Sequence, residues 1–140
     1  MKQLTILLAA LVLTTSLSLA EGGKKLVVLI AGKPSHPPGA HEHNAGVLLF
    51  KKCLEQSAAE AVEIKHHLNG EWPAEDELAK ADTILIYSDG GGGHPALQGD
   101  RLQQLDKQMK RGCGFVCVHY AVEPTIEKGN NEFIDWLGGA

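Results

Sequence analysis

The sequence predicts an α/β fold of three layers, in which helices cover both faces of a doubly wound parallel sheet. Short apolar runs rich in Val and Ile alternate with helical patterns along the chain, which is typical of β-α-β units. Three of these runs lead into glycine and histidine. Because the carboxyl ends of parallel strands lie along one edge of a sheet, we expect these histidines, and the function, at that edge.

The first strand is expected at residues 25–31 (KLVVLIA), because an almost continuous β-branched apolar run indicates a strand covered on both faces. Residues 32–43 follow as a loop, since three prolines and a glycine disfavour regular structure there. From residue 44 to about 59 apolar side chains repeat with helical spacing, and Asn44 is the expected N-cap.

Residues 61–67 (AVEIKHH) alternate apolar and polar side chains, which predicts a half-exposed edge strand. A short helical turn is expected over 72–78, and a buried strand at 82–87 (DTILIY). The glycine tetrad at 90–93 is expected to be a loop without regular structure.

A helix is expected from about residue 97 to Gly112, whose position suits a C-terminal cap. The fourth strand is predicted at 114–119 (GFVCVH) and a short helical turn at 132–137. Since four strands make a small sheet and the sequence stops shortly afterwards, we expect residues 24–140 to be one domain that lacks a carboxyl-terminal part.

Residues 1–20 are typical of a cleaved secretory signal peptide. A positive start, an apolar run and small residues before Ala20 form the usual pattern, so we expect cleavage after Ala20 and a periplasmic or secreted protein. An uncleaved membrane anchor is the alternative, but the apolar run is short for a span.

Composition narrows the possible partners. The formal net charge is −4 and no basic block is present, which disfavours nucleic acid and anionic membranes as partners. Removal of the signal leaves about 120 residues, enough for one domain with a hydrophobic core.

The three cysteines do not indicate a disulfide framework. Cys113 and Cys117 lie in one predicted strand, where their Cα atoms would be roughly 13 Å apart, too far for a disulfide. Cys53 and Cys117 are expected to be buried, inert thiols.

An ordered set of motifs now shows a family resemblance: GKPSH, YSDGGGGHPA, a helix leading to RGCGFVCVHYA, and EFIDWLGG. Together they resemble the ThuA-like family of trehalose utilisation, whose fold is similar to class I glutamine amidotransferases. The resemblance implies a flavodoxin-like sheet and a link to carbohydrate metabolism. Amidotransferase-type relatives carry a nucleophilic cysteine at the turn after the strand that reads GFVCVH here, but His119 is nearest to that turn. We therefore do not expect a glutamine amidotransferase.

His119 is the first catalytic candidate, since an imidazole at the end of a strand can ligate a metal or transfer protons near neutral pH. A turn histidine bonded to backbone is the alternative. A metal site, with zinc as the first candidate ion, is expected from histidines of the first loop together with His119, because zinc sites draw on His and carboxylate ligands. The expected ligands are His36, His41, His43 and His119. A solvated polar loop is the alternative for the first three.

The segment 88–94 supplies the remaining candidates before the last strand. Asp89 is expected to act as an acid or base, and Gly90, Gly91, Gly92 and His94 to bind substrate, because glycines allow close backbone approach. A Walker-type phosphate loop is excluded, since no Gly-Lys-Ser/Thr follows. A flexible loop in which Asp89 caps a turn is the alternative.

Three further residues complete the expected site. Glu123 is expected to orient the His119 imidazole or to act as a base, although a surface carboxylate is the commoner outcome. Tyr120 and Asn44 are expected to contact the substrate, with Asn44 orienting a sugar hydroxyl.

Four other aromatic and histidine residues are not assigned to the site. Trp72 and Trp136 are interpreted as core residues, and His66 and His67 as a solvent-facing pair.

Two functions remain open at this stage. The first is a carbohydrate-active hydrolase, lyase or isomerase that uses a divalent metal on a sugar or keto-sugar. The second is a non-catalytic domain that binds carbohydrate or docks a partner, since a fold alone does not carry an activity. In both cases the expected partner is a small carbohydrate, without nucleic acid and without a membrane span after signal cleavage.

Overall fold

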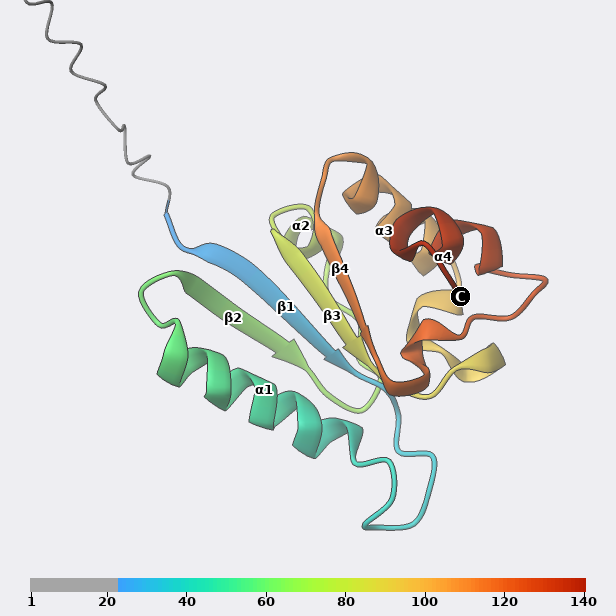
Figure 1. The fold of residues 1–140 in the computed structure, drawn as a ribbon, viewed down its shortest axis with the longest axis horizontal. Coiled ribbons are helices and arrows are strands. Elements are labelled where there is room, and N and C mark those ends of the chain that lie inside the picture. Colours follow the sequence, from blue (N-terminus) through green and yellow to red (C-terminus); the bar gives the residue numbers. More distant parts are fainter. Residues whose placement is uncertain (1–22) are drawn as a thin grey trace, which may run out of the picture.

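A computed structural model describes residues 23–140, so the predicted signal peptide lies outside the described residues. Four strands form one all-parallel sheet: β1 (Lys25–Ala31), β2 (Val62–His67), β3 (Thr83–Tyr87) and β4 (Gly114–Val118). Their order is β2-β1-β3-β4 (Figure 1). The α/β fold is therefore flavodoxin-like, as the sequence predicted.

Helices cover both faces of this sheet, which confirms the three layers (Figure 1). On one face lies α1 (His43–Ser57), with Val47 packed among Leu29 and Ala31 of β1. The other face carries the larger core and three helices: α2 (Glu75–Leu78), α3 (Arg101–Lys110) and α4 (Asn130–Leu137). Short 3-10 turns connect the elements: η1 (Gly91–Gly93), η2 (Pro95–Leu97) and η3 (His119–Val122).

Phe133 connects the last helix to the sheet and to the glycine-rich turn. Its side chain is fully buried. Its ring lies edge-to-face at 5.5 Å from Phe115 of β4 and at 5.4 Å from His94. Burying such a ring contributes about 2 kcal/mol, so Phe133 helps to fix the segment that follows β3.

The register brings the carboxyl ends of three strands level. Ala31 at the end of β1 pairs with Tyr87 at the end of β3, and Tyr87 pairs with Val118 at the end of β4. The chain continues from β1 to β2 on one side and reaches β3 on the other. The loops after β1 and β3 therefore meet at the point where strand order reverses, the usual place for a ligand in such a sheet.

Most predicted elements are confirmed, including the edge position of β2 and the end of α3 before Gly112, which has φ +88°. Two differ. The glycine tetrad is not irregular, because Gly91 adopts φ +64° and its carbonyl accepts a bond from the amide of His94, which closes η1. The helix predicted from residue 97 begins at Arg101, because Leu97 belongs to η2.

The prediction that Cys53 is buried is wrong, since this cysteine is exposed. It lies six residues after Val47, which at 3.6 residues per turn rotates it about 120° away from the face that packs on the sheet. Cys117, by contrast, packs against the larger core.

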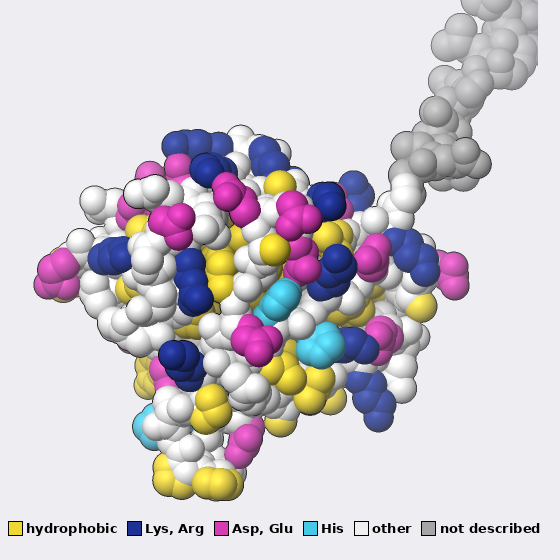
Figure 2. Space-filling model, turned by 180° about the vertical axis from the view of Figure 1, so that it is seen from behind, with side chains coloured by type: hydrophobic (Ala, Val, Ile, Leu, Met, Phe, Trp, Pro, Cys, Tyr) yellow, Lys and Arg dark blue, Asp and Glu magenta, His cyan; other side chains and the backbone are white. Residues whose placement is uncertain are grey.

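Between residues 23 and 140, no helix has both the length and the apolar character that a membrane span requires. On the face shown in Figure 2, Lys and Arg side chains are interspersed with Asp and Glu rather than gathered in one block. The expectation against a nucleic-acid partner stays a prediction that agrees with this surface.

Candidate metal centre

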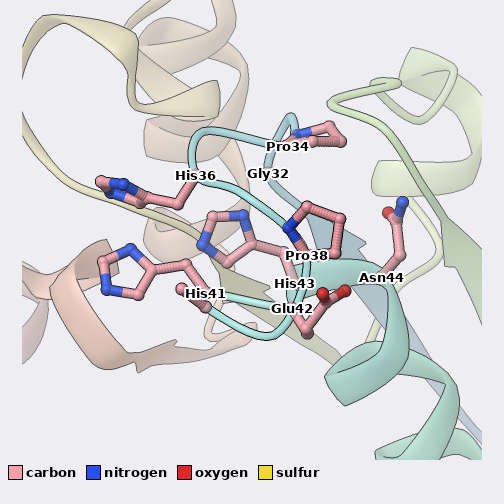
Figure 3. A pocket seen from close by; sticks show the side chains of 9 residues that line it. Gly32, Pro34, His36, Pro38, His41, Glu42, His43 and Asn44 are labelled. Carbon is pink, nitrogen blue, oxygen red and sulfur yellow. The ribbon is translucent and has the colours of Figure 1, made fainter.

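The loop between β1 and α1 presents three histidines to one side. His36, His41 and His43 lie together, whereas Glu42 and Asn44 turn away from them (Figure 3). Local bonds hold this shape: a Glu42 carboxylate oxygen accepts from the amide of Gly39 at 2.7 Å, and the amide of His43 donates to the carbonyl of His41 at 2.8 Å.

Asp89, just beyond the end of β3, meets all three imidazoles. Its Oδ1 lies 2.8 Å from Nδ1 of His41 and 3.7 Å from Nε2 of His43, and its Oδ2 lies 3.9 Å from Nε2 of His36. One ligand atom each from His36, His41 and Asp89 lies within 4.8 Å of the other two. His and carboxylate donors of this kind suit zinc.

Three buried atoms of this cluster have no hydrogen-bond partner among the described residues: Nδ1 of His41, Nε2 of His43 and Oδ1 of Asp89. Nδ1 of His41 and Oδ1 of Asp89 approach each other to 2.8 Å as an ion pair, and this contact is one of those that lower the pKa of Asp89. A buried polar atom without a partner costs about 1–3 kcal/mol, and native structures contain few. A cation at this place could satisfy the Asp89 carboxylate and the two imidazole nitrogens together.

The orientation of His43 supports the same interpretation. Its side chain is only 1% exposed, and its Nδ1 lies 3.1 Å from the carbonyl oxygen of Lys33. A carbonyl only accepts, so Nδ1 must carry a hydrogen, and in the neutral ring Nε2 then carries the lone pair. That lone pair faces the Asp89 carboxylate, another acceptor. Metal-ligating histidines commonly donate their second nitrogen to a backbone carbonyl in this way.

Asp89 is held in its charged form. Burial alone would raise the pKa of this carboxyl, but the contact with Ser35 and the positive charges available on His43 and His41 outweigh burial, so the pKa lies below its usual value. An ionised carboxylate is the form that coordinates a metal.

Two histidines at the site have strained backbones. His41 has φ +52° and His119 φ +62°, and Asn69 is the only other described non-glycine residue with a positive φ. Such conformations cost about 1–3 kcal/mol and cluster at functional sites. His119 is exposed, and its ring centroid lies 4.6 Å from that of His41, so this strain holds the imidazole beside the cluster.

His94 does not join this group. It is fully buried; its Nε2 bonds the carbonyl of Ala121 at 3.0 Å, and its Nδ1 accepts from the amide of Ala96 at 3.0 Å. Burial lowers its pKa to about 4, against a smaller opposing effect of the bond to Ala121. Both nitrogens are used within the fold, which leaves neither for the substrate-binding role that we predicted.

The glycines play different parts from those expected. A Cβ on Gly90 would lie 2.5 Å from the carbonyl oxygen of Glu123 and 2.7 Å from that of Tyr120, so this glycine makes room for the turn after β4. The amide of Gly91 donates to the same Glu123 carbonyl at 2.8 Å. Gly92 is exposed and open on its Cβ side, and its carbonyl oxygen accepts from Nε2 of Gln98 at 2.8 Å.

The last three candidates, Tyr120, Glu123 and Asn44, differ in whether they lie beside the histidine cluster. Tyr120 is 47% exposed with its ring 4.5 Å from that of His119, so it borders the site. Glu123 is exposed, and within the described chain its carboxylate shows no bond to His119. Asn44 neither caps α1 nor faces the histidines, because its side chain bonds the side chain of Asn69 at 2.7 Å and its amide at 2.9 Å.

Other expectations from the sequence agree with the structure. Burial raises the pKa of Cys117 to about 12, which removes it as a nucleophile at neutral pH. Trp72 and Trp136 pack against the larger core. His67, however, is not simply solvent-facing, because its Nε2 lies 2.7 Å from a carboxylate oxygen of Glu77.

Sequence reasoning missed the role of Lys33, whose carbonyl orients His43, and it did not place Asp89 among the residues that could hold a metal. The position of Asp89 directly after a buried strand was a usable signal, but the Lys33 contact is made by backbone and leaves no trace in residue type.

Comparisons of this chain with models of known families, with curated proteins and with solved structures give no match.

Proposed function

We propose that this protein is a metal-dependent enzyme of the ThuA-like type, secreted or periplasmic, that acts as a hydrolase, lyase or isomerase on a sugar or keto-sugar. The convergence of His36, His41 and Asp89, whose ligand atoms lie within 4.8 Å of one another, is the observation that carries this proposal. The family resemblance of the sequence motifs supports the carbohydrate substrate.

His36, His41 and Asp89 are the proposed ligands, and Nε2 of His43 faces the same carboxylate from the buried side. A divalent ion at such a site polarises a carbonyl or lowers the pKa of a bound water toward neutrality. His36 is 48% exposed, so its side chain is free to rotate and bring its ring nitrogen closer to the other two ligands.

His119 and Tyr120 are the proposed residues on the substrate side. Both are exposed at the edge of the cluster, and the ring of His119 lies 4.6 Å from that of His41, which lines a cavity of about 240 Å³ in the first loop. With Asp89 committed to the ion, His119 is left to move the proton, since a positioned imidazole can act as general acid or base. Tyr120 offers a ring face and a hydroxyl to a sugar.

Titration of chelator-treated protein with zinc chloride tests the metal site. We expect one zinc per chain, and at least a hundredfold weaker binding in His41→Ala and in Asp89→Asn, because each loses a ligand. His66→Ala is the matched control, since His66 is an exposed imidazole on the edge strand β2. Zinc binding that is absent, or equal in Asp89→Asn and in the control, contradicts the proposal.

A non-catalytic carbohydrate-binding domain is the second candidate. It is favoured by one observation, the exposed Glu123 carboxylate, which leaves His119 without a carboxylate partner among residues 23–140. Calorimetry with a sugar separates the two functions. Binding that survives both chelator and His119→Ala supports the non-catalytic domain, and loss of binding under either condition supports the enzyme.

A further inference from the structure

We propose that the substrate of this site carries an acidic group, a carboxylate or a phosphate, and that a second cavity lined by Lys33 and Arg101 binds that group. The inference rests on the proposed function for the reacting end of the substrate. The anion site itself is formed by residues other than the proposed metal ligands.

The second cavity has a volume of about 360 Å³ and lies between the loops that follow β1, β2 and β3. This is the size of a small-molecule site. Two cations line it, together with Gln98 and the backbone of three glycines and a proline, and no Asp or Glu does. The cavity therefore presents positive charge and polar groups without a carboxylate to neutralise them.

Arg101 is held in place without a charged partner. Its guanidinium lies 4.9 Å from the centre of the Trp72 ring, and its Nη1 donates to the carbonyl of Pro95 at 3.1 Å. It forms no ion pair with any described residue, and burial lowers its pKa against a smaller opposing effect of Asp100. A fixed, partly desolvated guanidinium with unused N–H donors is suited to bidentate binding of a carboxylate or phosphate.

Lys33 reaches the same cavity across Gly70. A Cβ on Gly70 would lie 2.5 Å from Cγ of Lys33, and Gly70 has φ +75°. The glycine thus gives the lysine stem a place to lie, and no ion pair within residues 23–140 occupies its ammonium group. The carbonyl of Lys33 orients His43, so one residue connects the metal cluster and the second cavity.

A third cavity of about 180 Å³ lies next to the other two. It shares Lys33 and Gly93 with the cationic cavity, and Gly32 and Pro34 with the cavity in the first loop, and Asp89 lies on its wall. A molecule that follows this path has one end at the metal ligands and the other at the two cations. This arrangement fits a sugar acid or a sugar phosphate better than a neutral sugar.

The test is titration of ¹⁵N-labelled full chain with gluconate, with glucose 6-phosphate and with glucose, followed by NMR. We expect saturable shifts of the Arg101 Nε–H and Gly93 signals with one or both anions, and at least tenfold weaker binding of glucose. The double variant Lys33→Gln/Arg101→Gln should lose at least tenfold in anion affinity. Lys24→Gln/Lys52→Gln is the charge-matched control, because both residues are exposed and neither lines the cavity.

Gluconate and glucose 6-phosphate distinguish the two sources of anionic charge. The inference is overturned if neither anion shifts these signals, if glucose binds equally well, or if the cavity variant responds as the control does. Zinc titration of the same cavity variant separates this inference from the proposed function. Unchanged zinc binding with lost anion binding supports both, whereas anion binding in a protein that takes no zinc supports only the cationic cavity.

Discussion

His43 and His94 are both almost completely buried histidines at the carboxyl edge of the sheet, yet their surroundings differ in one respect. His94 uses both ring nitrogens in bonds to backbone, at Ala96 and Ala121. His43 uses only Nδ1, and its Nε2 faces Asp89 without a hydrogen bond. Burial is therefore the same in the two cases, and the number of satisfied nitrogens separates a structural histidine from one arranged to bind a ligand.

The difference also predicts opposite energetics. His94 stabilises the turn between η1 and η2 because two backbone groups would lose their partner without it. His43 forms one backbone bond but leaves a buried nitrogen unsatisfied. Its net contribution to the free energy of unfolding of the metal-free protein is therefore smaller than that of His94. Comparison of variants at these two positions tests whether this distinction is real.

The largest expected effect is on the stability of the metal-free protein. His94→Ala should lower the free energy of unfolding by about 3 kcal/mol, because it opens a cavity and leaves two buried backbone groups unpaired. His43→Ala should cost only about 1.5 kcal/mol, since one bond is lost and one unsatisfied atom is removed. Urea unfolding measures both, and equal losses would abolish the distinction between the two histidines.

Zinc should separate the same pair in the opposite direction. A ligand at 100 times its dissociation constant raises the free energy of unfolding by about 2.7 kcal/mol. We expect a gain of this size in wild-type protein and in His94→Gln, and a much smaller gain in His43→Ala, measured by thermal unfolding with and without zinc chloride. A full zinc response in His43→Ala would place His43 outside the metal site.

Acid should reduce the contribution of His94 to the free energy of unfolding. Its pKa in the folded protein is about 4, below the ordinary 6.5, so the unfolded chain binds a proton that the folded chain does not as pH falls from 6.5 to 4. The contribution of this group is fully present above pH 6.5 and decreases by about 2 to 3 kcal/mol at pH 4.5. Urea unfolding at pH 7 and at pH 4.5 should show a loss larger by this amount in wild-type protein than in His94→Gln, and parallel losses would contradict the assignment.

The alternation of apolar runs and helical patterns was sufficient to predict the fold, and the ends of parallel strands were sufficient to bring His36, His41 and Asp89 to one edge. The roles of His94 and Gly90 were not predictable from local pattern. Each depends on the turn after β4, whose carbonyls at Ala121 and Glu123 come from a distant part of the chain. Residue type showed which side chains were capable of chemistry, and only tertiary contacts showed which were already engaged.

The smallest expected effect concerns His119, whose backbone at φ +62° carries strain that His94 does not. Asparagine tolerates this left-handed conformation better than histidine, so His119→Asn should raise the free energy of unfolding by about 0.5 kcal/mol. Its zinc affinity should be unchanged, because His119 is not one of the three histidines that face Asp89. Urea unfolding and zinc titration of this variant provide the two measurements. A gain in stability with zinc binding intact would mean that the imidazole is kept there for a role other than folding or holding the ion, whereas a loss of 1 kcal/mol or more would make His119 a second structural histidine like His94.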